Sequence, residues 1–150
     1  LGNQLATTGQ PEAALKAYEQ ALQVNASVGG LDRSELVLLH VQRAAVYQAL
    51  GDLDKAEEAA FVAMMTDQSE PLVHKAMGDL LRARGSLAAA QKAYERAQKM
   101  APSIPDIYFD LGEVLWDQGK QEEARQKFDL YLQMAPNGQH AEDARGYLNP

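Results

Sequence analysis

The amino-acid sequence predicts an all-α protein built from repeated pairs of helices. Three observations lead to this prediction: glycines recur at a fixed spacing, small and large residues recur at fixed distances from them, and prolines stand where helices should begin and end. Gly51, Gly85 and Gly119 follow one another at intervals of 34 residues. A repeat of that length suits one helix–turn–helix unit, which can bury its apolar face only against a neighbouring unit.

The first repeat is incomplete in this chain. Gly9 stands in the same register as the later glycines, but the interval from Gly9 to Gly51 is 42 residues, eight more than the others. Residues 1–28 therefore hold only the end of a first helix, the turn and a second helix. Because a complete unit needs a complete first helix, we expect the parent protein to continue upstream.

The eight additional residues, 29–36, include the start of the next helix. Asp32 followed three residues later by Glu35 is a capping-box pattern, in which each side chain satisfies a backbone N–H at the start of a helix. We therefore expect this helix to begin near Arg33, about one turn before the equivalent place at Val37. The extension has two interpretations: a protruding edge that contacts a partner, or an insertion that a helix end tolerates at little cost.

Residues 37–70, 71–104 and 105–138 form the second, third and fourth repeats. In every repeat a small residue lies seven positions before the turn glycine, and an alanine lies five positions after it. Small residues let two helices approach closely, while aromatic residues nine positions after the glycine, in every repeat but the second, fill the space between them. In chain order, the small residues are Gly2, Ala44, Gly78 and Gly112, the alanines are Ala14, Ala56, Ala90 and Ala124, and the last set is Tyr18, Ala60, Tyr94 and Phe128.

Glycine and proline mark the ends of the predicted helices. A glycine at the end of a first helix adopts the left-handed C-cap conformation at little cost, because it has no Cβ. Pro71 and Pro105 mark the starts of two first helices, whereas Pro102 and Pro136 lie just beyond two second helices and prevent their continuation. Residues 139–150 form a short amphipathic helix, which either caps the last repeat or begins a fifth.

This 34-residue pattern resembles the tetratricopeptide repeat, and the resemblance covers residues 1 to about 138. It implies a right-handed superhelical solenoid whose first helices line a concave groove, where such arrays usually hold a peptide or helix of another protein. The second repeat departs most from the pattern. It carries Arg43 where the family prefers an apolar residue, Ala60 where it prefers an aromatic one, and Gln68 where it prefers proline.

Composition and motifs exclude several classes of function. The net charge is −7, so the chain lacks the basic surface that nucleic acid binding requires. No apolar run approaches the ~20 residues of a membrane helix, so we expect no membrane insertion in this fragment. The sequence has no cysteine and no nucleotide-binding, metalloprotease or serine-hydrolase motif. We therefore predict no enzymatic activity, no cofactor and no metal site.

Two of the three histidines occupy equivalent positions. His40 and His74 each lie eleven residues before a turn glycine. Stacked helices would hold them ~10 Å apart, whereas a shared metal ion needs a closer approach and further ligands. We therefore expect packing or partial exposure for both, in preference to a metal-binding or pH-sensing role. His140, in the terminal helix, is expected to be exposed to solvent.

The first helix of the fourth repeat carries the main part of the candidate binding site. At 100° per residue, Phe109 and Trp116 point away from the core side chain of Leu111, so we expect an aromatic pair on the opposite face. Trp116 has a second interpretation, which is packing against the terminal helix near Tyr147 or Leu148, or against a repeat outside this fragment. The carboxylates that flank the aromatic pair are Asp106, Glu113 and Asp117.

The equivalent faces of the other repeats complete the predicted groove. Some tetratricopeptide co-chaperones hold a C-terminal carboxylate in a clamp of lysines, an arginine and asparagines. That clamp is not assembled here, because Gln42, Leu72 and Ala76 occupy clamp positions, although Asn3 matches one. The groove residues are Asn3 in the first repeat, Leu38, Val41 and Gln48 in the second, and Lys75, Asp79 and Arg82 in the third.

This groove favours a partner protein or peptide with apolar and basic residues, whose cations are directed towards the carboxylates of the fourth repeat. Lys75 and Arg82 offer an alternative, since they can pair with those carboxylates across the gap between helices. The competing hypothesis is structural. In it, the chain forms a homo-oligomer through the ends of the array or through the helix that carries Leu38 and Val41.

Overall fold

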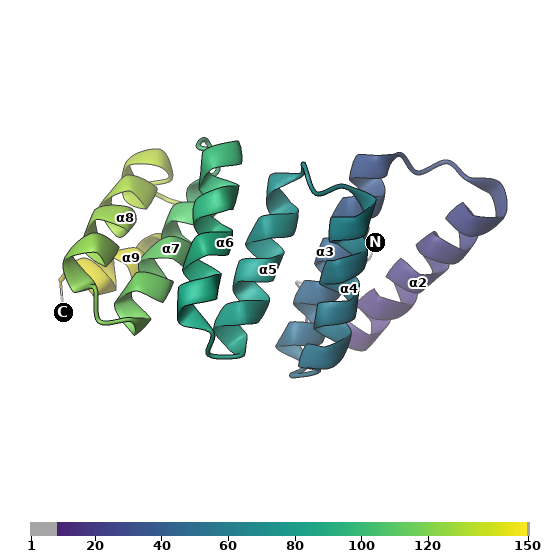
Figure 1. Ribbon diagram of the computed structural model, residues 1–150, viewed down its shortest axis with the longest axis horizontal. Helices are drawn as coiled ribbons and strands as arrows, with labels where there is room; N and C mark the ends of the chain where they lie inside the picture. Colours follow the sequence, from purple (N-terminus) through teal and green to yellow (C-terminus); the bar gives the residue numbers. More distant parts are fainter. Residues whose placement is uncertain (1–8, 150) are drawn as a thin grey trace. The chain divides into compact units, whose positions relative to one another are not determined.

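The computed structural model describes residues 9–149, and every regular element in that range is an α-helix. The all-α fold class predicted from the sequence is confirmed. The chain divides into two compact units, Leu1–Ala76 and Met77–Pro150, and the boundary falls inside helix α5. Figure 1 labels the helices and colours them along the sequence, and each unit is described by itself below.

The first unit contains α2 (Pro11–Val28), α3 (Arg33–Ala49), α4 (Leu53–Thr66) and the start of α5 (Pro71–Ala83). Helix α3 begins at Arg33, as predicted, and its capping box is formed in both directions. The Asp32 side chain accepts a hydrogen bond from the Glu35 backbone N–H at 2.8 Å, and the Glu35 carboxylate accepts one from the Asp32 N–H at 2.8 Å. Whether this extension contacts a partner stays a prediction.

Helices α3 and α4 form a hairpin with very small side chains at their contact. The turn glycine Gly51 has a φ of 77°, which is the left-handed conformation predicted for it. In Figure 1, α3 lies behind α4. Four alanines of α4 are buried, so the two helices approach closely, and the side chains of α4 that are fully buried are all methyl groups. They are Ala56, Ala59, Ala60 and Ala63.

The second unit contains the rest of α5, then α6 (Leu87–Met100), α7 (Pro105–Asp117), α8 (Gln121–Met134) and α9 (Ala141–Leu148). The predicted proline positions are confirmed. Pro71 and Pro105 are the first residues of α5 and α7, and Pro102 and Pro136 each lie two residues beyond the end of a helix. Among the described residues, no helix is long and apolar enough to cross a membrane.

Glycines at two helix contacts leave room for aromatic rings in the second unit. A Cβ on Gly78 would lie 2.6 Å from the ring of Tyr94, and a Cβ on Gly112 would lie 2.5 Å from the ring of Phe128. Real Cβ atoms do not approach so closely, so only glycine fits at either place. Both rings are almost completely buried, which agrees with the predicted pairing of small and large residues.

Helix α9 covers the last part of this core. It packs against α8 and lies behind it in Figure 1, in yellow. Ala141 and Ala144 are buried, and the Tyr147 ring stacks on Phe128 with centroids 4.4 Å apart and planes 6° apart. The hydroxyl of Tyr131 accepts a hydrogen bond from the His140 backbone N–H at 3.0 Å, which holds the start of α9 against α8.

Candidate partner-binding surface

Helix α7 has buried residues on two faces, and this overturns one expectation. Seven of its 13 residues are buried, and Phe109 is only 4% exposed. The prediction that Phe109 lies on an open face opposite the core is therefore wrong. The helical wheel places Phe109 correctly relative to Leu111, but it does not show that α8 and α9 pack over that second face.

The Phe109 ring lies inside an aromatic cluster. It stacks on the His140 ring with centroids 4.3 Å apart and planes 10° apart. The rings of Phe128 and Tyr131 lie tilted against it at 5.6 and 5.5 Å. His140 is consequently half-buried rather than exposed to solvent, because its ring covers Phe109. Phe109 belongs to the core of the second unit and offers a partner no surface.

Trp116 packs against the terminal helix, which is the second of the two interpretations given for it. Its ring is half-buried against the core of the second unit and meets the Tyr147 ring edge-on, with centroids 5.1 Å apart. Aromatic pairs at this distance and angle are favourable beyond the area that they bury. Trp116 therefore packs against the terminal helix, and part of its side chain is left in solvent.

The carboxylates Glu113 and Asp117 pair with Arg82, as the alternative in the sequence analysis anticipates. The guanidinium donates from Nε to Asp117 Oδ2 at 2.9 Å, and its second nitrogen bonds Glu113 Oε2. Burial alone would lower the pKa of Arg82, but the hydrogen bonds and charges of Asp117 and Glu113 raise it above its usual value. This ion-pair cluster joins α5 and α7 within the second unit.

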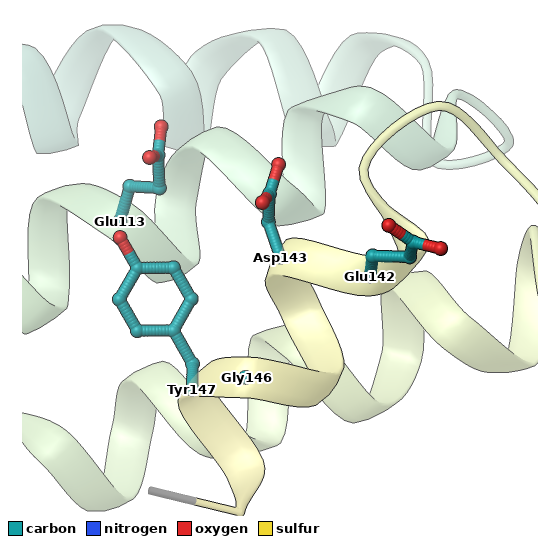
Figure 2. A pocket seen from close by; sticks show the side chains of 5 residues that line it. All are labelled: Glu113, Glu142, Asp143, Gly146 and Tyr147. Atoms are coloured by element: carbon teal, nitrogen blue, oxygen red, sulfur yellow. The ribbon is translucent and has the colours of Figure 1, made fainter.

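An open hollow of about 540 Å³ lies between α7 and α9, and we call it the acidic hollow. Glu113 of α7 lies on one side, and Glu142, Asp143, Gly146 and Tyr147 of α9 line the other. Figure 2 shows the Tyr147 ring standing up from α9 with its hydroxyl towards Glu113, while the Asp143 carboxylate projects from the same side of the helix.

The electrostatics of the acidic hollow disfavour further negative charge. Burial raises the pKa of Tyr147, the carboxylate of Glu113 raises it further, and Arg82 acts in the opposite direction. Glu142 and Asp143 are exposed residues in the first turn of α9. Carboxylates there also interact favourably with the positive end of the helix dipole. Within residues 9–149, neither of them forms an ion pair.

The remaining candidates of the second unit take different positions. Asp79 is half-buried and accepts a hydrogen bond from the Tyr94 hydroxyl at 2.7 Å, so it supports the core. Burial, and then the nearby Asp79 and Asp110, raise the pKa of Tyr94 well above its usual range. Asp106 is a half-buried residue in the first turn of α7. The structure gives neither Asp79 nor Asp106 a place in the lining of the acidic hollow.

The candidates of the first unit are described by themselves. Leu38 is 41% exposed on α3, whereas Val41 packs partly against a buried cluster around Val37 and Ala63. Gln48 is half-buried near the end of α3, and Lys75 is half-buried on α5. Asn3 lies outside the described residues.

His40 and His74 are both buried, in agreement with the expected packing. The His40 Nδ1 lies 3.4 Å from a guanidinium nitrogen of Arg43, and His74 Nε2 lies 3.0 Å from the backbone oxygen of Gln68. Burial lowers the pKa of His40, and the positive charge of Arg43 lowers it further. Among the described residues, no group of three or more histidine, aspartate or glutamate side chains is arranged to hold a metal ion.

Sequence reasoning missed three of the five residues that line the acidic hollow. Glu142 and Asp143 were not predicted, because a helical wheel drawn for α7 alone contains no information about a helix that begins 24 residues after α7 ends. Tyr147 was expected only as a packing partner of Trp116. A usable signal was present, since the terminal helix carries two adjacent carboxylates beside an aromatic residue one turn later.

The sequence itself identifies the repeat family. Models of the tetratricopeptide repeat match residues 1–27, 37–60 and 75–139. The chain belongs to the tetratricopeptide repeat family. No protein of curated function matches the sequence.

Solved structures share the tetratricopeptide fold. The crystal structure of MamA matches 97% of this chain and 81% of its own, with 20% identity and a TM-score of 0.67. The first tetratricopeptide domain of Spaghetti (RPAP3), bound to the HSP90 peptide SRMEEVD, matches 77% of this chain and 92% of its own, with 21% identity and a TM-score of 0.67. The second such domain of human RPAP3, in complex with the HSP70 peptide SGPTIEEVD, matches 79% of this chain and 99% of its own, with 17% identity and a TM-score of 0.66.

Proposed function

We propose that this protein is an interaction scaffold, without catalytic activity, that binds a partner segment carrying basic and apolar residues. The acidic hollow is the observation that carries the proposal. Glu113, Glu142 and Asp143 surround a space of about 540 Å³ that is open to solvent. A space of this size admits several side chains of an extended segment.

Charge supports a basic ligand. Arg82 offsets only part of the negative charge, because it pairs with Glu113 and Asp117 while Glu142 and Asp143 form no ion pair in residues 9–149. The chain as a whole has a net charge of −7, which attracts a positively charged partner over a longer range. Electrostatic complementarity of this kind raises the association rate and makes the choice of partner more specific.

Aromatic rings support an apolar component in the same ligand. Tyr147 lines the acidic hollow, and the half-buried Trp116 ring lies directly against it. Aliphatic parts of lysine or arginine side chains pack on such rings, and their charged groups also interact favourably with aromatic faces. A ligand with alternating arginine and leucine fits both properties of the surface.

The peptides held by the two RPAP3 domains differ from this ligand. SRMEEVD and SGPTIEEVD both end in acidic residues and a terminal carboxylate. The present chain has Gln42, Leu72 and Ala76 at clamp positions, and it has carboxylates around its hollow. The proposal is therefore a peptide-binding scaffold of opposite charge preference.

A direct test measures peptide binding through Trp116, which is the only tryptophan and lies beside the acidic hollow. An extended peptide of alternating arginine and leucine should change the tryptophan emission on binding, whereas the same peptide with glutamate for arginine should bind more weakly. The double variant Glu142→Gln with Asp143→Asn should lower the affinity for the arginine peptide by roughly three- to tenfold, since it removes two exposed charge interactions.

The matched control is Glu122→Gln with Glu123→Gln. This pair is also adjacent, exposed and in the first turn of a helix, α8, but it lies outside the lining of the hollow. Binding should be unchanged in the control. An equal loss in both double variants, or tighter binding of SRMEEVD than of the arginine peptide, would contradict the proposal.

Self-association is the competing hypothesis, and one observation favours it. Leu38 is 41% exposed on α3, although Val41 next to it is partly buried in the unit's own core. An oligomer built through this helix should show a mass that rises with concentration in sedimentation equilibrium. Leu38→Gln should abolish that rise.

A further inference from the structure

The outer face of α4 exposes three large apolar side chains. Phe61 is 57% exposed, Met65 is 71% exposed and Val62 is 36% exposed. Together they leave roughly 300 Å² of apolar surface in water, which is near the size of the largest patch on a typical monomer. We call these three residues the α4 patch.

The other repeats place mostly polar residues at the same positions. The turn glycine gives the register, since Phe61, Val62 and Met65 lie ten, eleven and fourteen residues after Gly51. Of the nine equivalent residues, eight are charged or amide side chains, so the repeat itself does not require apolar residues there. In chain order they are Glu19, Gln20, Gln23, Glu95, Arg96, Lys99, Asp129, Leu130 and Gln133.

Phe61 is not a displaced core residue. The position that holds the buried rings of Tyr94 and Phe128 in the later repeats is occupied in the second repeat by Ala60, which is completely buried. Phe61 is the next residue along the helix, and it therefore points about 100° away from Ala60. The α4 patch contributes little to the contact between α3 and α4, and its apolar character needs another explanation.

A stripe along α4 combines the patch with negative charge. Asp54, Glu58, Phe61 and Met65 are spaced four, three and four residues apart, so they lie on one face of the helix. All four are exposed. The stripe is about 16 Å long, with carboxylates in its N-terminal half and apolar side chains in its C-terminal half. Lys55 nearby pairs with Asp52 at 2.8 Å and also interacts electrostatically with Glu58, so the stripe keeps more carboxylates than cations.

We propose that the α4 patch binds an amphipathic helix of another protein, in antiparallel orientation. The partner helix carries apolar residues in its N-terminal half, against Phe61 and Met65, and lysine or arginine in its C-terminal half, near Glu58 and Asp54. Cations at the C-terminal end of the partner helix also interact favourably with the negative end of that helix's dipole. Two large anchors one turn apart suit recognition of a single helix.

Area and charge argue against a second copy of this chain as the occupant. A stable dimer buries about 800 Å² on each partner, which is more than twice the area of the patch. Two copies also each carry a net charge of −7, and their acidic residues would repel as they approach. A basic helix meets neither difficulty.

The test uses a fluorescein-labelled helical peptide of about 16 residues, which is about 24 Å long and so spans the whole stripe. Leucines lie one turn apart in its first half and lysines one turn apart in its second half, in an alanine-rich background. Fluorescence anisotropy should show binding to the full chain. A triple variant replaces the patch with the residues that α6 has at these positions: Phe61→Glu, Val62→Arg and Met65→Lys. It should weaken binding at least ~10-fold, because it removes both anchors.

The matched control is Leu130→Arg. Leu130 is 39% exposed and lies on α8 at the position equivalent to Val62, and the substitution changes the net charge by the same amount as the triple variant. The control should bind as the wild type does. Met65→Lys alone, at the most exposed of the three positions, should weaken binding in the same direction. It serves as the test if circular dichroism shows that the triple variant has lost helix.

Four results would overturn the proposal. The first is that the peptide binds the wild type and the triple variant equally, or does not bind the wild type. The second is that a peptide with glutamate for lysine binds equally well. The third is a concentration-dependent dimer of the wild type that the triple variant lacks, which would make a second copy the occupant. Glu142→Gln with Asp143→Asn should leave most of this binding intact, because the acidic hollow is proposed to hold an extended segment whereas this peptide is helical. The fourth result is a loss in that variant equal to the loss in the triple variant, which would place the peptide in the acidic hollow and overturn the proposal for the α4 patch.

Discussion

The second repeat and the fourth repeat build the same helix hairpin with opposite side chains. In the fourth repeat, Gly112 on α7 leaves room for the ring of Phe128 on α8. In the second repeat, Ala44 on α3 and Ala60 on α4 occupy the same two positions, and both are buried. The hairpin of the fourth repeat therefore places a glycine against a large aromatic ring. The hairpin of the second repeat places one methyl group against another.

The difference changes what each hairpin can support. Phe128 contacts Phe109 and Tyr147, so its ring connects α7, α8 and α9 in one core. Two methyl groups cannot reach a third helix in this way, and three large apolar residues that follow Ala60 on α4, namely Phe61, Val62 and Met65, are exposed. The aromatic pairing extends the core, whereas the alanine pairing leaves apolar surface available.

The largest expected effect comes from removing the aromatic ring of the fourth repeat. Phe128→Ala should lower the free energy of unfolding by about 3–5 kcal/mol, because the ring is completely buried and its loss leaves a cavity among three helices. Ala60→Gly, at the equivalent position, should cost only about 1 kcal/mol, from helix propensity. Urea denaturation of both variants measures the difference. Equal losses would mean that the two hairpins are supported in the same way.

A graft tests whether the two positions are coupled. Ala60→Phe should destabilise the second repeat by about 1–3 kcal/mol, because the ring has no room beside the Ala44 methyl group. Adding Ala44→Gly should recover part of that loss, since it recreates the pairing of Gly112 and Phe128. The measurement is a double-mutant cycle on unfolding free energy. Additive losses would show that the spacing of α3 and α4 depends on other contacts.

The smallest expected effect is a pH dependence of stability that His40 gives to the second repeat. Burial and Arg43 lower the pKa of His40 in the folded state, so the unfolded state binds a proton more readily. The neutral histidine then contributes stability that is present above its usual pKa near 6.5 and is lost as the pH falls through the lower folded value. Urea midpoints at several pH values should fall more steeply on acidification for the wild type than for His40→Asn. A parallel fall in the two proteins would contradict this assignment.

Helix ends were predictable from the sequence because their causes are local. Pro71 and Pro105 begin helices, Gly51 adopts a left-handed turn, and the capping box of Asp32 and Glu35 starts α3 at its predicted place. In each case the controlling interaction lies within a few residues of the helix end. The pairing of Gly112 with Phe128 was also visible, since the repeat register aligns the two positions.

Contacts between distant residues were predictable only in part. Arg82 was recognised as a possible partner of the α7 carboxylates, because equivalent faces of neighbouring repeats come together. Phe109 was misplaced, since the wheel could not show that His140 would stack on it. The α4 patch was missed although the register reveals it, because its positions lie on a second helix and belong neither to the core pattern nor to the predicted groove.

The shortness of α9 has a thermodynamic consequence for the acidic hollow. A helix of eight residues is not stable alone in water, so Glu142 and Asp143 hold their positions only while α9 is docked. Docking of α9 and occupation of the hollow are therefore linked equilibria, and a ligand that needs both faces must stabilise the docked form. In amide hydrogen exchange, such a ligand would slow the α9 amides more than those of α7, even though it touches both helices.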